Sequence, residues 1–160
     1  MQKVRFVLFA LALAAITAAS ASAAREAKPI LVSGTYAGQA STKIDSGTAT
    51  IAATGTGKLT LLGAGKIVGN GTGDSTQQPC VPFGGTGTIS GPGGVITWKA
   101  PTNANACGDE GGHTFTVKGT LQVVKATGKL AKAKGSIRFS GVYSHDDGSF
   151  SVKLTGTLKK

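Results

Sequence analysis

The sequence predicts an all-β domain, an antiparallel β-barrel of about eight strands, and two observations carry that prediction. First, apolar residues recur with a period of two along much of the chain, with Ser, Thr and Lys between them. This is the pattern of strands that bury one face. Second, glycine repeatedly takes the apolar parity in segments of the form apolar-x-Gly-x-apolar. A two-sheet β-sandwich is the alternative fold that the same pattern allows.

The clearest strands lie in the C-terminal third of the chain. Residues 113–124 alternate between apolar and polar side chains, and residues 135–158 contain two further alternating segments. His145-Asp146-Asp147-Gly148 separates these two segments. Its three potential metal ligands invite a metal interpretation, but Asp and Gly are the residues that a tight hairpin turn requires. We therefore predict a hairpin turn at this position.

The glycine-rich first part of the chain gives weaker signals. We expect turns at 45–47, 55–57 and 91–94, the last being a strong turn signal, with Ile96 and Trp98 pointing inward. Two long loops are expected at 71–85 and 101–112. The expected strands lie between these breaks, at 30–40, 48–54, 58–62, 65–70, 86–90 and 95–100. A basic connection follows at 125–134, with Leu130 as its one large apolar residue.

The glycine motif favours a barrel over a sandwich. Glycine weakens a strand, so its repeated use at the inward parity suggests a geometric purpose. Glycine kinks let strands coil tightly enough to close a barrel and leave room inside it. The motif occurs in four segments: 32–36, 117–121, 139–143 and 154–158.

Residues 1–23 have the three-part layout of a secretory signal peptide. Lys3 and Arg5 give a positive start, residues 6–16 are apolar, and Ala21-Ser22-Ala23 is the expected cleavage site. The apolar run is shorter than the roughly 20 residues of a spanning helix. We therefore expect a secreted protein, extracellular or periplasmic and bacterial in composition, whose residues 24–160 form a single barrel domain.

The expected mature chain is strongly basic, since loss of the two signal-peptide cations lowers the net charge from +10 to +8. A basic balance favours anionic neighbours such as a surface polymer, an acidic polysaccharide, anionic lipid or nucleic acid. It also suits a solvated surface on which lysines keep strand edges unpaired. The basic residues of 125–138 lack the interleaved aromatics of a nucleic-acid surface, so no specific nucleic-acid partner is predicted.

Cys80 and Cys107 are the two cysteines of the chain. In an exported protein such a pair is expected to form a disulfide. Neither a C-x-x-C motif nor a nearby pair of histidines favours a metal site instead. The bond should tie the two long loops together at one end of the domain, with a contribution of roughly 3–4 kcal/mol in the chain-entropy model.

Asp109, Glu110 and His113 are the candidates for a functional site, on the rim beside Cys107. A carboxylate and a histidine that are held on a rim can act as an acid–base pair or bind a divalent cation. A glycine-rich loop with solvated charges is the alternative interpretation. Because the sequence contains no nucleophile motif, phosphate loop or zinc signature, no catalytic, cofactor-binding or metal-ligating residue is assigned.

The segment 127–135, Thr-Gly-Lys-Leu-Ala-Lys-Ala-Lys-Gly, resembles the Gly-[Lys/Arg]-Phe-x-x-Ala-x-Gly signature of the allene oxide cyclase/dirigent-like β-barrel proteins, including similar secreted bacterial proteins. Leu130 replaces the usual Phe. The resemblance implies an eight-stranded antiparallel barrel with a central cavity. It does not imply the cyclisation or radical-coupling chemistry of the plant proteins, because none of their functional residues matches a position in this chain.

Three functions follow as expectations. The first is a secreted, non-enzymatic barrel that binds a small apolar ligand or acts at the cell surface. The second is an isomerase- or cyclase-type enzyme whose cavity shapes a reactive intermediate, which requires an ionisable or polar side chain in the lumen. The third is an outer-membrane barrel, since alternation alone does not tell whether the apolar face points into the barrel or outward.

Overall fold

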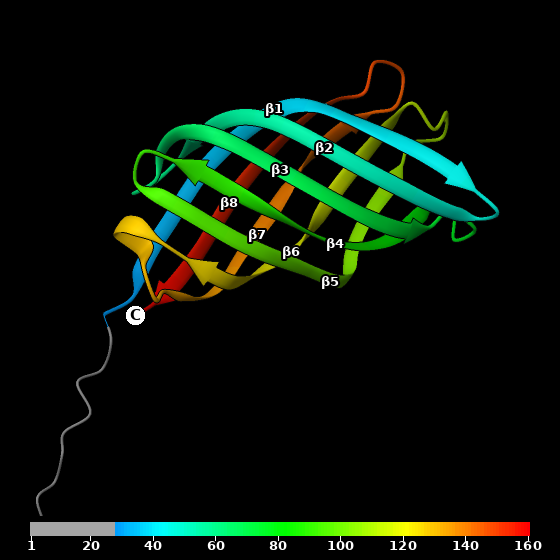
Figure 1. Cartoon of the computed structure of the whole chain (residues 1–160). Helices are drawn as coiled ribbons and strands as arrows, with labels where there is room; N and C mark the ends of the chain where they lie inside the picture. The colour runs from blue at the N-terminus through cyan, green and yellow to red at the C-terminus, as the bar shows by residue number, and fades with distance from the viewer. Residues whose placement is uncertain (1–27) are drawn as a thin grey trace, which may run out of the picture.

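The computed structural model describes residues 28–160 and forms one closed barrel in which every strand pairs antiparallel with its sequence neighbours (Figure 1). Closure is made by β1 and β8, in a register that sets Ile30 opposite Leu158. The predicted barrel is confirmed, and the sandwich alternative is wrong. The predicted signal peptide lies outside the described residues. The strands are β1 (Ile30–Asp45), β2 (Thr48–Leu59), β3 (Gly63–Asp74), β4 (Cys80–Gly91), β5 (Gly94–Gly108), β6 (Thr114–Ala126), β7 (Lys134–Ser144) and β8 (Ser149–Lys159).

The connections divide the barrel into two ends because each strand reverses direction relative to the one before. One end, called the closed end, carries the connections 60–62, 92–93 and 127–133 together with both ends of the described chain. A short 3-10 turn, η1 (Gly128–Leu130), lies in the last of these connections. The other end, called the open end, carries the connections 46–47, 75–79, 109–113 and 145–148. Within residues 28–160 no helix has the length and apolar character needed to cross a membrane.

The closed end is filled by apolar side chains. Leu62 and Leu130 come from connections rather than strands, and both are almost wholly buried over the end of the barrel. They pack with inward-facing strand residues in one core cluster. The strand residues of this cluster that are 0% exposed are Leu59, Ile89, Ile96, Ile137 and Leu158, with Ala104 farther along β5. Burial of this apolar surface is the main stabilising contribution to the fold.

Inward-facing glycines make room for the rings of neighbouring strands. A Cβ added at Gly119 would lie 2.6 Å from Cβ of Ala104 and 2.7 Å from the Phe139 ring. A Cβ at Gly69 would lie 2.9 Å from the Trp98 indole. Even alanine at these two positions would therefore displace a packed neighbour. This agrees with the expected geometric purpose of glycine at the inward parity.

Three predicted breaks in the first part of the chain are wrong. Residues 55–57 lie inside β2, because Gly55 is an inward position over which the Phe150 ring packs. The predicted loop 71–85 shrinks to 75–79, and the predicted loop 101–112 shrinks to 109–113. The predicted loop 101–112 overlaps a real irregularity, because the hydrogen-bonded pairing of β5 with β6 is interrupted between Lys99 and Asn105. The turns at 45–47 and 91–94 and the inward direction of Trp98 are confirmed.

Candidate functional site

An apolar cavity of about 300 Å³ occupies the open half of the barrel. Aliphatic, aromatic and small side chains from all eight strands line it, and polar groups are few. Most of the apolar lining residues are only partly buried, in contrast to those at the closed end. The lining consists of Ala40, Thr42, Ile44, Ala49, Ile51, Ala53, Ile67, Gly69, Ser75, Gln78, Val81, Phe83, Ala106, Gly112, Phe115, Val117, Leu121, Phe139, Tyr143, His145, Phe150, Val152 and Leu154.

The cavity exists because small residues stand side by side where large ones would fill the barrel. Ala40 on β1 is opposite Ala53 on β2, and Ala53 is opposite Gly69 on β3. All three line the cavity. Three adjacent strands therefore contribute almost no side-chain volume at this level. Well-packed protein interiors contain few voids larger than a water molecule, so a void of this size is the candidate site of the molecule.

The floor of the cavity is formed by residues that also belong to the core. Leu121, Phe139 and Leu154 line the cavity and are buried in the core cluster. Tyr36 and Trp98 lie in the same cluster, next to lining residues: Tyr36 is paired with Val152, and the Trp98 indole packs against Gly69. Among the described residues, no group hydrogen-bonds the Tyr36 hydroxyl or the Trp98 indole N–H. Burial raises the pKa of the Tyr36 hydroxyl.

Polar groups are confined to the mouth of the cavity. The Tyr143 hydroxyl and the Thr42 hydroxyl lie 3.3 Å apart and link β7 to β1. Ser75, Gln78 and His145 complete the polar part of the lining, and all three belong to connections of the open end. The arrangement suits a ligand whose apolar body enters the barrel and whose polar end, if it has one, stays at the mouth.

His113 and Asp146 join two connections beside the mouth. His113 Nδ1 lies 2.9 Å from Asp146 Oδ1, and the backbone N–H of His145 donates to the His113 carbonyl at 2.8 Å. The hydrogen bond and the negative charge of Asp146 raise the pKa of the His113 imidazole. Both side chains are about two-thirds exposed, so the pair is solvated and adds little stability. The two connections are nevertheless held together at this point.

The side chains of the three predicted rim residues form no carboxylate–imidazole hydrogen bond with one another. The Asp109 carboxylate accepts hydrogen bonds from the backbone N–H groups of His113 at 2.9 Å and Thr114 at 3.2 Å. Partial desolvation raises the pKa of Asp109, but these backbone hydrogen bonds outweigh it and the pKa is lowered overall. Glu110 is exposed and takes no part in this network. The imidazole pairs instead with Asp146, for which the sequence predicts only a place in a hairpin turn.

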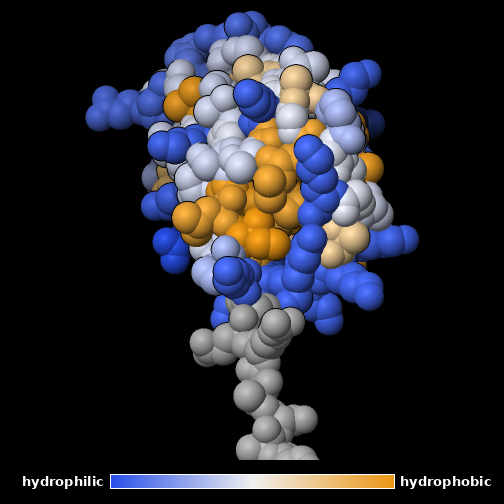
Figure 2. Space-filling model, turned by 90° about the vertical axis from the view of Figure 1, so that its left-hand side faces the viewer, coloured by the Kyte–Doolittle hydropathy of each residue, from blue (hydrophilic) through white to orange (hydrophobic). Residues whose placement is uncertain are grey.

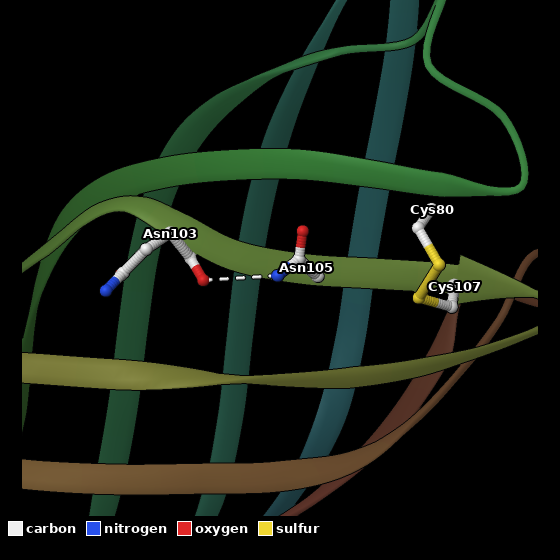
Figure 3. The surroundings of a disulfide bond; sticks show 4 residues. All are labelled: Cys80, Asn103, Asn105 and Cys107. Atoms are coloured by element: carbon white, nitrogen blue, oxygen red, sulfur yellow. Dashed lines mark hydrogen bonds between the residues drawn. A yellow bond between two sulfur atoms is a disulfide. The ribbon is translucent and has the colours of Figure 1, made fainter.

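Cys80 and Cys107 form the predicted disulfide on the outer surface near the open end (Figure 3). The two residues are not in loops as predicted but are direct neighbours across β4 and β5. The bond follows the interruption in β5, where the Asn105 side chain donates to the Asn103 carbonyl at 3.2 Å. The next pair in the register, Val81 and Ala106, lines the cavity. The disulfide therefore fixes this part of the cavity wall.

All carboxylate side chains of the described chain gather at the open end. Hydrogen bonds within the turns lower the pKa of Asp74, through Thr76 and Gln77, and of Asp147, through Ser149. These carboxylates are ionised at neutral pH, and the mouth is ringed by negative charge although the protein is basic. The acidic residues are Asp45, Asp74, Asp109, Glu110, Asp146 and Asp147.

Within residues 28–160 no three His, Cys, Asp or Glu side chains converge in a way that could hold a metal ion. Comparison of the sequence with models of protein families and with curated proteins finds no match. The candidate function therefore rests on the cavity and its surroundings.

Proposed function

We propose that this protein is a secreted, non-enzymatic barrel that binds a small apolar ligand in the cavity at its open end. The observation that carries the proposal is the apolar lining of a space of about 300 Å³ that opens at a polar mouth. Natural ligand sites are concave, mainly apolar and supplied with a few polar groups that orient the ligand. The allene oxide cyclase/dirigent-like resemblance, which implied a barrel with a central cavity, agrees with this proposal.

The size of the cavity limits the ligand. A protein cavity of about 150 Å³ accommodates benzene, so twice that volume accommodates a body of roughly 10–15 carbon atoms. A bicyclic aromatic or terpenoid skeleton, or an alkyl chain of that length, satisfies this limit. The negative ring at the mouth disfavours an anionic end group, because like charges repel at short range. We therefore propose a neutral or cationic ligand.

Two observations favour this proposal over its alternatives. The deep part of the cavity holds only apolar side chains, whereas Tyr143 and His145 stand at the mouth. A cyclase-type enzyme that used these two groups is the second candidate, and it predicts that the bound compound is converted. An outer-membrane barrel requires an apolar outer band. Here the core residues face inward, and outward positions carry polar side chains such as Thr35, Lys153 and Thr155.

The proposal includes export of the protein from the cytoplasm. A disulfide on the protein surface agrees with an oxidising compartment, where such bonds form and persist. Expression of the full chain in a bacterial host, followed by fractionation and mass spectrometry of the N-terminus, tests both export and cleavage after Ala23. Full-length protein that stays in the cytoplasm would contradict this part of the proposal.

Binding is tested by titrating the secreted protein with the neutral fluorophore N-phenyl-1-naphthylamine. Ala53→Phe should weaken binding by about tenfold or more, because the new ring occupies the cavity at the level of Ala40 and Gly69. Ala52→Phe is the matched control, since Ala52 is the neighbouring residue and is exposed on the outer face.

Equal effects of the two variants, or no binding by the wild type, would contradict the proposal. Compounds that co-purify with the secreted protein should be extracted and identified by mass spectrometry. Recovery of an added ligand unchanged after incubation supports binding, and appearance of an isomer supports the enzyme candidate.

A further inference from the structure

The closed end combines an exposed apolar patch with a surrounding ring of lysines. Figure 2 looks onto this end and shows hydrophobic side chains gathered in the middle of the face, with hydrophilic ones around them. Leu61 in the β2–β3 connection is 42% exposed, and Leu31 at the start of β1 is 72% exposed. Large apolar side chains that are contiguous and exposed usually mark an interaction surface.

The charged side chains of residues 28–160 at this end have one sign. Every Asp and Glu side chain of these residues lies at the opposite end of the barrel, so none of them offsets the lysines here. The lysines belong to the connections, to the adjoining ends of the strands and to the two ends of the described chain. They are Lys28, Lys58, Lys125, Lys129, Lys132, Lys134, Lys159 and Lys160.

Leu61 is an unfavourable residue for its position on two counts. Its backbone has φ 69°, in the left-handed region that glycine or asparagine adopts at low cost and that a branched side chain avoids. Its side chain is also partly exposed to solvent. Glycine or asparagine would remove both costs, so neither local geometry nor solubility explains a leucine here. Residues kept in such conformations cluster at functional sites.

We propose that the closed end docks on an anionic lipid bilayer, with Leu61 and Leu31 entering the interface and the lysines contacting the headgroups. A soluble polyanion offers charge alone and would leave the apolar patch in water. A bilayer satisfies both features, because it pairs anionic headgroups with an apolar layer beneath them. The mouth of the cavity then faces away from the membrane, and its negative ring is repelled by the same surface.

The test uses protein that an exporting host has secreted and processed, with its N-terminus read by mass spectrometry. Binding is measured by co-flotation with vesicles of phosphatidylcholine alone and of phosphatidylcholine with a third phosphatidylglycerol. The wild type should bind the anionic vesicles and not the neutral ones. Lys129→Glu with Lys132→Glu should lower the partition coefficient about tenfold or more. Leu61→Asn should lower it roughly three- to tenfold.

Matched controls sit elsewhere on the barrel. Val68 on the outer wall of the barrel is 42% exposed, as Leu61 is, and Val68→Thr removes an apolar group there. Lys43→Glu reverses a charge near the open end. Neither should change binding much. Leu61→Asn is also expected to fold well, since asparagine tolerates a positive φ. Failure to bind anionic vesicles would overturn the proposal. Equal binding by Leu61→Asn and wild type, with full competition by soluble polyphosphate, would overturn it in favour of a polyanion.

Discussion

The two halves of the barrel use the same alternating strands for different purposes. In the closed half, inward positions such as Leu59 and Ile137 are wholly buried, and Leu130 from a connection covers the end. In the open half, inward positions such as Ala40 and Ala53 leave a cavity. Apolar packing is therefore concentrated at one end of the barrel and the cavity at the other. The comparison indicates that a cavity can be kept open because the opposite half stabilises the fold.

The largest expected effect distinguishes the two halves directly. Ile137→Ala should lower the free energy of unfolding by about 2–5 kcal/mol, because it creates a void in the packed core of the closed half. Ile51→Ala should lower it by about 1 kcal/mol or less, because Ile51 is partly exposed and already faces the cavity. Urea denaturation monitored by Trp98 fluorescence measures both. Equal losses would show that the open half contributes as much to stability as the closed half.

The disulfide should be the principal cross-link of the open half. Replacing Cys80 and Cys107 together by Ser removes a constraint on residues 27 positions apart and should cost roughly 3 kcal/mol. Because Val81 and Ala106 are adjacent to the bond, ligand binding should weaken even at temperatures where the variant stays folded. Calorimetry and fluorophore titration of the same sample provide the comparison. A variant with lowered stability and unchanged binding would show that the wall is held by other contacts.

A smaller effect separates the two tyrosines. Tyr143→Phe should cost about 1 kcal/mol, because it removes the hydrogen bond to Thr42 at the mouth. Tyr36→Phe should be nearly neutral or slightly stabilising, since no described group partners its buried hydroxyl. A marked loss for Tyr36→Phe would reveal a partner of that hydroxyl. Denaturant unfolding at neutral pH makes the measurement.

Tyr36 also predicts how the stability of the protein depends on pH. Burial raises the pKa of Tyr36 in the folded protein, so the neutral hydroxyl is favoured there. Its contribution to stability is present below the unfolded pKa, about 10, and is lost as pH rises through the folded pKa. Tyr36→Phe should therefore keep more of its stability in alkaline solution than the wild type does. Parallel loss in both proteins would assign the alkaline transition to other groups.

The smallest expected effect concerns the rim. Asp146 raises the pKa of His113, so the linkage between the two connections is strongest below about pH 6.5 and is lost as pH rises through the folded pKa. Asp146→Asn should lower the midpoint of the His113 imidazole titration observed by NMR. Asp147→Asn, in the same turn but paired with Ser149, is the control and should leave the midpoint nearly unchanged. An unchanged midpoint in Asp146→Asn would contradict the pairing.

The sequence was sufficient to predict the barrel where strands carry large side chains. Residues 113–158 alternate clearly, and their strands β6, β7 and β8 lie close to where alternation predicts them. The glycine-rich strands are harder to predict from the sequence. A glycine that forms a turn cannot be told there from a glycine inside a strand that makes room for an aromatic ring of another strand. The sequence predicts a break at Gly55, yet Gly55 lies inside β2 beneath the ring of Phe150 of β8. That contact joins residues almost a hundred positions apart.

The site was less predictable than the fold for a related reason. The cavity depends on Ala40, Ala53 and Gly69 standing at one level of three strands, which only the register reveals. The partner of His113 was likewise hidden, because Asp146 is distant in sequence and its place in a turn already explained it. One signal was available: the acidic residues follow alternate strands, which places them at one end of any antiparallel meander.

The pairing of β1 with β8 places both ends of the described chain on the same face, beside each other (Figure 1). A short linker could therefore join Lys160 to Lys28, and the chain could be reopened between Ser46 and Gly47. Such a circular permutant would keep the strand order around the barrel while its new termini emerged beside the cavity mouth. A sensor domain fused there would lie next to any ligand in the cavity, whereas Lys28 and Lys160 lie at the opposite end of the barrel.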